Sequence, residues 1–312
     1  MKVLKNLLAV LLMLTIAMSC DPNDPVIDPG TPTSELKLYL IDTAKINSIK
    51  TDGTSEQILI NRKFNTSSYI SGLCFNNEGT RMIYVDEQNP NFTGIKSTIR
   101  SANLDGSDDK EIYQVMDDMQ IDMIKVTDDN KIFVIQSNGQ LNSIKNITMN
   151  LDGTGVQVVT GYRIYTDLTK NKKYGISRSG SGTNPNRISI IDLTGDAGAG
   201  SLYMNVDFPD FPYEGSFSND GKYAIIPFKD GANLKLRVVD MMAKTFTDKI
   251  IKSNYTASWA YLFARLSNDG KKLVYTIAGD TPKSETIIFN LSDNTSSSFL
   301  NNDDNIFEVY PY

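Results

Sequence analysis

Phe217-Ser218-Asn219-Asp220-Gly221, followed by the apolar run Tyr223-Ala224-Ile225-Ile226, is the stretch of sequence that decides the fold. A short apolar strand ends in a polar turn, and a second apolar strand begins directly after the turn. Close copies of the turn stand at Phe75-Asn76-Asn77-Glu78-Gly79 and Leu266-Ser267-Asn268-Asp269-Gly270, each again followed by an apolar run. This repetition of one strand-turn-strand unit predicts an all-β protein built from repeats.

A second turn signal alternates with the first. It is clearest at Asp52-Gly53, Asp105-Gly106 and Asp152-Gly153, and Asp-Gly favours tight hairpins because glycine readily adopts a positive φ. The weaker copies of the two signals lie at 126–130 and 168–172 for the first turn, and at 193–195, 241–244 and 291–294 for the second. Together they define units of four antiparallel strands in about 42 to 53 residues, the size of a propeller blade.

The first turn occurs five times and the second six times, and the two ends of the repeat region explain the difference. Leu36–Leu40 looks like a second strand without a first, whereas Ile306–Tyr310 looks like a first strand without a second. Pairing residues 304–312 beside 36–43 would complete a sixth blade and leave no long exposed edge. We therefore predict a six-bladed β-propeller over residues 36–312; seven blades or an irregular sandwich are the alternatives.

The first-turn segments resemble the repeat of the TolB-type propeller family, whose pattern is roughly Phe-Ser-Pro-Asp-Gly before an apolar strand. Phe217–Gly221 and Leu266–Gly270 match this pattern with Asn in place of Pro, and Ile99–Ser107 is similar to the outer half of the same repeat. The resemblance implies a six-bladed propeller of the periplasm or cell surface. TolB carries a further α/β domain before its propeller, for which residues 1–35 leave no room, so its role in the cell envelope does not transfer.

Residues 1–19 have the features of a lipoprotein signal peptide. Lys2 and Lys5 precede an apolar segment, Leu7–Ile16, that is too short to span a bilayer. Ala17-Met18-Ser19-Cys20 resembles a lipobox, so we predict cleavage before Cys20 and lipidation of its thiol. Residues 20–35, rich in Pro, Asp and Gly, would form a disordered tether. The alternative is an ordinary secreted protein with an incidental cysteine.

Composition excludes several kinds of chemistry. The sequence contains no histidine and, apart from Cys20, only Cys74, which removes His-dependent nucleophilic catalysis and zinc sites built from His or Cys. The formal charge of −6, which becomes −8 without residues 1–19, and the lack of a basic cluster argue against nucleic acid as a partner. The acidic residues of 301–305 lack the spacing of a calcium loop, and the Gly-rich stretch 177–183 leads into no helix, so no cofactor or metal is expected.

In a propeller, the loops that lead into the innermost strands form one rim of the central channel. The residues on these segments are the candidate ligand-binding residues: Tyr69, Asp122, Arg163, Tyr165, Tyr213, Glu214, Trp259, Tyr261 and Glu308, with Phe307 beside the last. Aromatic faces beside carboxylates suit a sugar ring or a peptide segment. The competing interpretation is that the aromatic residues fill the wedge between blades and that the charged residues pair with one another.

The sequence therefore predicts a cell-envelope lipoprotein, attached to the outer membrane through its lipid alone, whose propeller is a non-catalytic binding or scaffold module for a glycan, peptide or protein. The alternative is a carboxylate-based enzyme similar to a glycoside hydrolase, with Glu214 and either Asp122 or Glu308 as the acid/base pair. A third interpretation is an assembly role in which the outer blade surfaces make the contacts.

Overall fold

The computed structural model describes residues 36–62, 68–88, 96–115, 119–138, 143–160, 165–178, 185–194, 200–210, 212–255, 261–267, 270–278, 284–301 and 306–312. The chain divides into two units, residues 1–35 and Leu36–Tyr312, and every described residue belongs to the second. The predictions of a signal peptide, of a lipidated Cys20 and of a tether all lie outside the described residues.

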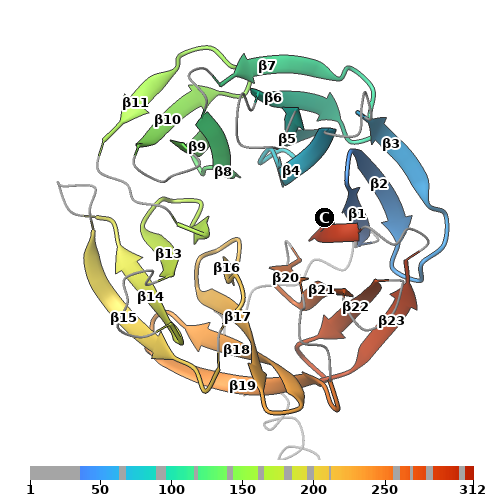
Figure 1. The fold of residues 1–312 in the computed structure, drawn as a ribbon, viewed down its shortest axis with the longest axis vertical. Coiled ribbons are helices and arrows are strands. Elements are labelled where there is room, and N and C mark those ends of the chain that lie inside the picture. The colour runs from blue at the N-terminus through green and yellow to red at the C-terminus, as the bar shows by residue number, and fades with distance from the viewer. Residues whose placement is uncertain are drawn as a thin grey trace, which may run out of the picture. The chain divides into compact units, whose positions relative to one another are not determined.

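Six four-stranded antiparallel sheets form a ring around a central axis (Figure 1). We number these blades in chain order and give their strands from the axis outward. Blade 1 contains β24 (Ile306–Pro311), β1 (Lys37–Asp42), β2 (Lys45–Lys50) and β3 (Gln57–Asn61). Blade 2 contains β4 (Ser68–Phe75), β5 (Arg81–Gln88), β6 (Lys96–Asn103) and β7 (Lys110–Gln114). Blade 3 contains β8 (Met119–Val126), β9 (Lys131–Asn138), β10 (Ile144–Asn150) and β11 (Gln157–Val159).

The remaining three blades continue the same order around the ring. Blade 4 contains β12 (Asp167–Leu168), β13 (Tyr174–Arg178), β14 (Arg187–Asp192) and β15 (Ser201–Asp207). Blade 5 contains β16 (Ser216–Phe217), β17 (Tyr223–Asp230), β18 (Asn233–Asp240) and β19 (Thr245–Lys252). Blade 6 contains β20 (Tyr261–Leu266), β21 (Lys272–Ala278), β22 (Glu285–Asn290) and β23 (Ser296–Leu300). The prediction of an all-β, six-bladed propeller is confirmed.

Burial within each blade follows from the face-to-face stacking of the sheets. The second strands β5 and β9 are buried at six consecutive positions, because neighbouring blades cover both of their faces. The outermost strand β19, by contrast, is exposed at five of its eight positions. The apolar core therefore consists of wedges between blades; one such wedge joins Tyr39 and Ile46 of blade 1 to Leu73 and Tyr84 of blade 2.

Blade 1 closes the ring by combining the two ends of the repeat region. Strand β24 pairs antiparallel with β1, with Leu38 opposite Pro311 and Leu40 opposite Val309. Backbone hydrogen bonds continue this ladder, since Lys37 N donates to Tyr312 O and Tyr312 N donates to Lys37 O, both at 2.8 Å. The predicted pairing of these two segments, and with it the completed sixth blade, is therefore confirmed.

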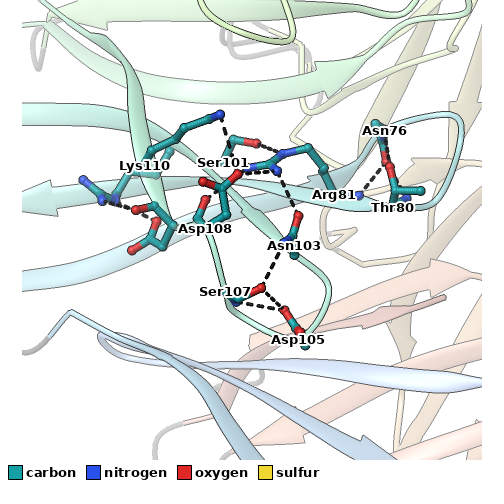
Figure 2. A network of polar contacts seen from close by, with 11 residues as sticks. Asn76, Thr80, Arg81, Ser101, Asn103, Asp105, Ser107, Asp108 and Lys110 are labelled. Atoms are coloured by element: carbon teal, nitrogen blue, oxygen red, sulfur yellow. Dashed lines mark hydrogen bonds and ion pairs between the residues drawn. The ribbon is translucent and has the colours of Figure 1, made fainter.

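Side-chain capping explains the turns that the sequence repeats (Figure 2). Asp105 Oδ1 accepts hydrogen bonds from Ser107 N at 2.9 Å and Ser107 Oγ at 2.6 Å, while Gly106 has a φ of 84°. In the first turn of the same blade, Asn76 Oδ1 accepts from Thr80 N at 2.9 Å. Arg81 then links the two turns by donating to Asp108 Oδ2 at 2.8 Å. Local hydrogen bonds thus define each turn, and Arg81 adds a link between the two.

Candidate binding site in the central channel

A cavity of about 610 Å³ lies where the innermost strands of the six blades converge. Its lining comes mainly from β4, β8, β12, β16, β20 and β24 and from the segments just before and after them. The charged residues of the lining are Asp122, Lys125, Asp167, Lys170, Glu214 and Arg265. Such a volume and such convergent polar groups are typical of a ligand site. We call the end where the inner strands begin the strand-start mouth and the opposite end the turn mouth.

Two carboxylates occupy the strand-start mouth. Asp122 lies at a β-bulge in β8, where the register with β9 shifts between Ile121 and Met123. A bulge redirects the side chain of the extra residue, and the Asp122 carboxylate is exposed to solvent in the cavity. Gln120 Nε2 donates to Asp122 Oδ1 at 3.2 Å. Glu214, the second carboxylate, precedes β16 and is also exposed.

The environment of Asp122 changes its acidity even though solvent reaches it. Protein surrounds the carboxylate on its other sides, and this partial desolvation raises the pKa of Asp122. A nearby carboxylate, Glu87, is buried, and burial is the main cause that raises its pKa. Glu87 accepts hydrogen bonds from Tyr69 Oη at 2.6 Å and from Ser71 Oγ at 2.8 Å. Ionisation of the carboxylates of Asp122 and Glu87 at the strand-start mouth is therefore less favourable than in water.

One residue of each inner strand, at the same repeat position, contacts the next blade. These six residues line the cavity and form what we call the inner ring: Cys74, Lys125, Asp167, Ser216, Arg265 and Tyr310. Each is the second-to-last residue of its inner strand, for example Cys74 before Phe75 and Lys125 before Val126.

Asp167 is the most connected member of the inner ring. Its Oδ1 accepts from Lys125 Nζ at 2.8 Å, which joins blade 4 to blade 3. The same oxygen accepts from Leu168 N at 2.9 Å, and Oδ2 accepts from Phe217 N of blade 5 at 2.8 Å. Both oxygens are therefore engaged, and one carboxylate ties three consecutive blades together.

The other members of the inner ring complete the circle. Ser216 Oγ donates to Ala264 O of blade 6 at 2.9 Å. The Arg265 guanidinium lies 5.4 Å from the centroid of the Tyr310 ring in blade 1. Tyr310 Oη accepts from Leu73 N of blade 2 at 3.1 Å. Burial raises the pKa of the Cys74 thiol to about 12, against a smaller opposite effect of its backbone hydrogen bond with Val126 of blade 3.

The predicted site residues do not all reach the cavity. Asp122 and Glu214 line it. Tyr69, Tyr165 and Tyr213 are not part of its lining: Tyr69 donates to Glu87, Tyr165 is buried in the core with Phe133, and Tyr213 packs half-buried against a core cluster of blades 5 and 6.

The remaining predicted residues cannot be placed in the same way. The backbones of Tyr261 and Glu308 lie in the inner strands β20 and β24, but their side chains are not among those described. Arg163 and Trp259 lie outside the described residues.

Sequence reasoning overlooked the inner ring and the turn mouth, where Lys170 and Asn77 line the cavity. A signal exists for five of the six inner-ring residues, since each stands directly before a first-turn segment of the sequence, whereas Tyr310 precedes none. Within the described part of the chain, no group of three or more acidic or cysteine residues is arranged to hold a metal ion. No helix in that part is long and apolar enough to cross a membrane.

Solved structures share this architecture. TolB from Acinetobacter baumannii is 14% identical with a TM-score of 0.64, and the alignment covers 89% of this chain but 66% of TolB. The nidogen/laminin complex contains a chain 15% identical with a TM-score of 0.61, covering 88% of this chain and 98% of that one. A putative TolB from Agrobacterium tumefaciens is 9% identical with a TM-score of 0.56, covering 89% and 97%.

No family model and no curated protein matches the sequence. The structural likeness therefore defines the fold: the chain is a six-bladed β-propeller. More particularly, its propeller is similar to that of the TolB structures.

Proposed function

We propose that this protein is a non-catalytic binding module of the cell envelope, which takes part of a glycan, peptide or protein into its central channel. The observation that carries the proposal is the cavity of about 610 Å³ at the convergence of the six inner strands. Its lining carries fixed polar and charged groups, because the contacts of the inner ring hold neighbouring blades together. Preorganised groups of this kind bind a ligand with little loss of side-chain entropy.

Glycan-array and peptide-library screens with the labelled protein test the channel. Any ligand found should bind at least about tenfold more weakly to the Asp122→Asn/Glu214→Gln double variant, because both carboxylates face the cavity. Glu111→Gln is the matched control, since this exposed residue lies on the outer strand β7. Ligands that lose affinity for the Glu111 variant and not for the double variant would place binding on the outer blade surfaces and refute the proposal.

The lipid anchor is a separate part of the proposal. Cys20 follows a short apolar segment and the lipobox-like sequence Ala17-Met18-Ser19, which supports lipidation at its thiol. Metabolic labelling with an alkyne fatty acid should mark the wild-type protein and leave Cys20→Ala unlabelled. Density-gradient fractionation should place the labelled protein with outer membranes. Equal labelling of both proteins would exclude Cys20 as the modified residue.

One observation favours the alternative of a carboxylate enzyme. Asp122 and Glu214 line the same cavity, and the raised pKa of Asp122 suits a general acid. A glycoside hydrolase would turn over members of a glycan panel, and both Asp122→Asn and Glu214→Gln would abolish turnover while the fold remains intact. The stereochemistry of the product would then report the carboxylate separation, about 5 Å for retention and about 6.5–9.5 Å for inversion.

A further inference from the structure

The turn mouth of the channel contains a positioned amine. Lys170 lies in the turn after β12, is half-buried and lines the cavity. Its Nζ donates to Asn77 Oδ1 of blade 2 at 3.2 Å. The Asn77 amide is itself oriented, because its Nδ2 donates to Thr127 O of blade 3 at 2.8 Å. The backbone also holds this turn in place, since Asp128 N donates to Lys170 O at 3.0 Å. The ammonium group is therefore fixed by contacts that span three blades.

No carboxylate in the described part of the chain forms an ion pair within 4.0 Å with this amine. The neighbouring cation, Lys125, is paired with Asp167, whose two oxygens are already engaged by Lys125 and by backbone N–H groups. Asp128, whose charge favours the ammonium form, is exposed on the surface. Among these lining residues, Lys125 and Lys170 carry two positive charges against the one negative charge of Asp167.

The acidity of Lys170 agrees with this charge balance. Burial is the main cause that lowers its pKa, and the positive charge of Lys125 acts in the same direction. An ammonium group has three donors, and Asn77 accepts one of them. An incoming anion would therefore gain a charge-assisted hydrogen bond and would also relieve the repulsion between the two lysines.

We propose that Lys170, positioned by Asn77, forms a subsite for an oxyanion, namely a carboxylate or phosphate group carried by the ligand of the channel. The inference rests on the proposed function, because it concerns the same cavity, and it adds the chemical class of the ligand. A ligand that fills the cavity directs its anionic group to the turn mouth, away from the carboxylates of Asp122 and Glu214 at the strand-start mouth.

Chemical acetylation of the purified protein measures the subsite directly. A water-soluble N-hydroxysuccinimide acetate modifies free amines, and peptide mass spectrometry gives the rate at each lysine. With inorganic phosphate, sulfate and acetate tested separately up to about 50 mM, at least one anion should slow acetylation of Lys170 by at least about fivefold. The exposed Lys222 is the internal control and should react at an unchanged rate. Comparing acetate with phosphate and sulfate distinguishes a planar carboxylate site from a tetrahedral one.

A pair of variants completes the test. The protecting anion should raise the melting temperature of the wild-type protein and of the Lys172→Gln variant, and it should leave the melting temperature of the Lys170→Gln variant unchanged. Circular dichroism confirms that each variant is folded. Lys172 is the matched control because it lies in the same turn and is paired with Asp129 at 3.3 Å. Unchanged acetylation of Lys170 with all three anions, or equal loss of the thermal shift in both variants, would overturn the subsite. Either result would leave the channel proposal to be judged by the Asp122 and Glu214 variants.

Discussion

Replacing Gly79 with alanine tests how the ring closes. A Cβ at Gly79 would lie 1.4 Å from Tyr312 Oη and 2.7 Å from Tyr312 Cζ, so the tyrosine would have to move. Its ring packs in an aromatic cluster, with its centroid 4.5 Å from that of Phe75 and 6.4 Å from that of Tyr39. Alanine at this position therefore disturbs the contact between the residue that follows β24 and blade 2.

Gly270 provides a matched control for the backbone. It stands at the same turn position in blade 6, and its φ of 69° is close to the 67° of Gly79. A Cβ at Gly270 would meet no described atom within 4 Å. Alanine in the left-handed region costs about 1 kcal/mol at either position. Displacing Tyr312 adds about 1–1.5 kcal/mol of aromatic packing for Gly79→Ala, which gives a total of about 2–2.5 kcal/mol.

Urea unfolding followed by circular dichroism measures both losses. We expect Gly270→Ala to lower the free energy of unfolding by about 1 kcal/mol and Gly79→Ala by about twice as much. Adding Tyr312→Phe to Gly79→Ala should recover part of the difference, because it removes the atom that the new Cβ meets first. Equal losses for the two alanine variants, within about 0.3 kcal/mol, would refute the packing of Tyr312 over Gly79.

Three further predictions concern the cavity lining. Asp167→Asn should lower the free energy of unfolding by about 3 kcal/mol because it leaves Lys125 without its ion-pair partner. The control Asp207→Asn, which breaks an exposed ion pair with Arg187, should lower it by less than about 1 kcal/mol. Urea unfolding at pH 7 measures both losses, and equal losses would contradict the proposed tie between the blades. In a Cys20→Ser protein, Cys74 should react with a thiol reagent at least about a hundredfold more slowly when folded than in urea, because desolvation raises the pKa of its thiol to about 12 although the residue is partly exposed at the cavity; similar rates would contradict the raised pKa. Asp122→Asn should stabilise the fold at pH 7 and have little effect at pH 3, because a raised carboxyl pKa penalises the folded state only above the unfolded value of about 3.9; a benefit that does not grow with pH would refute this sign.

The architecture could be predicted from the sequence because its determinants are local. An Asp-Gly turn and a capped polar turn are set by neighbouring residues, and Asp105 with Ser107 shows the capping directly. Counting the two kinds of turn also revealed the half-blade at each end of the repeat region. That count predicts the pairing of residues 304–312 beside 36–43, although the two segments are far apart in the chain, but it does not predict the register that places Leu38 opposite Pro311.

The candidate site was harder to predict because side chains alternate between the two faces of a strand. A shift of one residue exchanges the two faces. Knowing that a segment approaches the channel therefore does not determine which of its side chains point into the channel. Asp122 reaches the cavity at a bulge, which the sequence does not mark, while Tyr165 turns into the core beside Phe133 and Leu168. The turn pattern locates Lys125 and Asp167 near the ends of their inner strands, but their ion pair depends on how blades 3 and 4 meet, which no local pattern encodes.

The inner ring shows how a symmetric fold acquires an asymmetric channel. The six blades place one residue each at the same repeat position, yet no two of these residues are alike: a thiol, an ammonium, a carboxylate, a hydroxyl, a guanidinium and a phenol. Each makes a different contact with the following blade, so the six blades are not equivalent and the lining has no sixfold symmetry. A ligand on the axis would therefore meet a different chemical group from every blade. With carboxylates at one mouth and Lys170 at the other, the proposed ligand would bind in one rotation and one direction only.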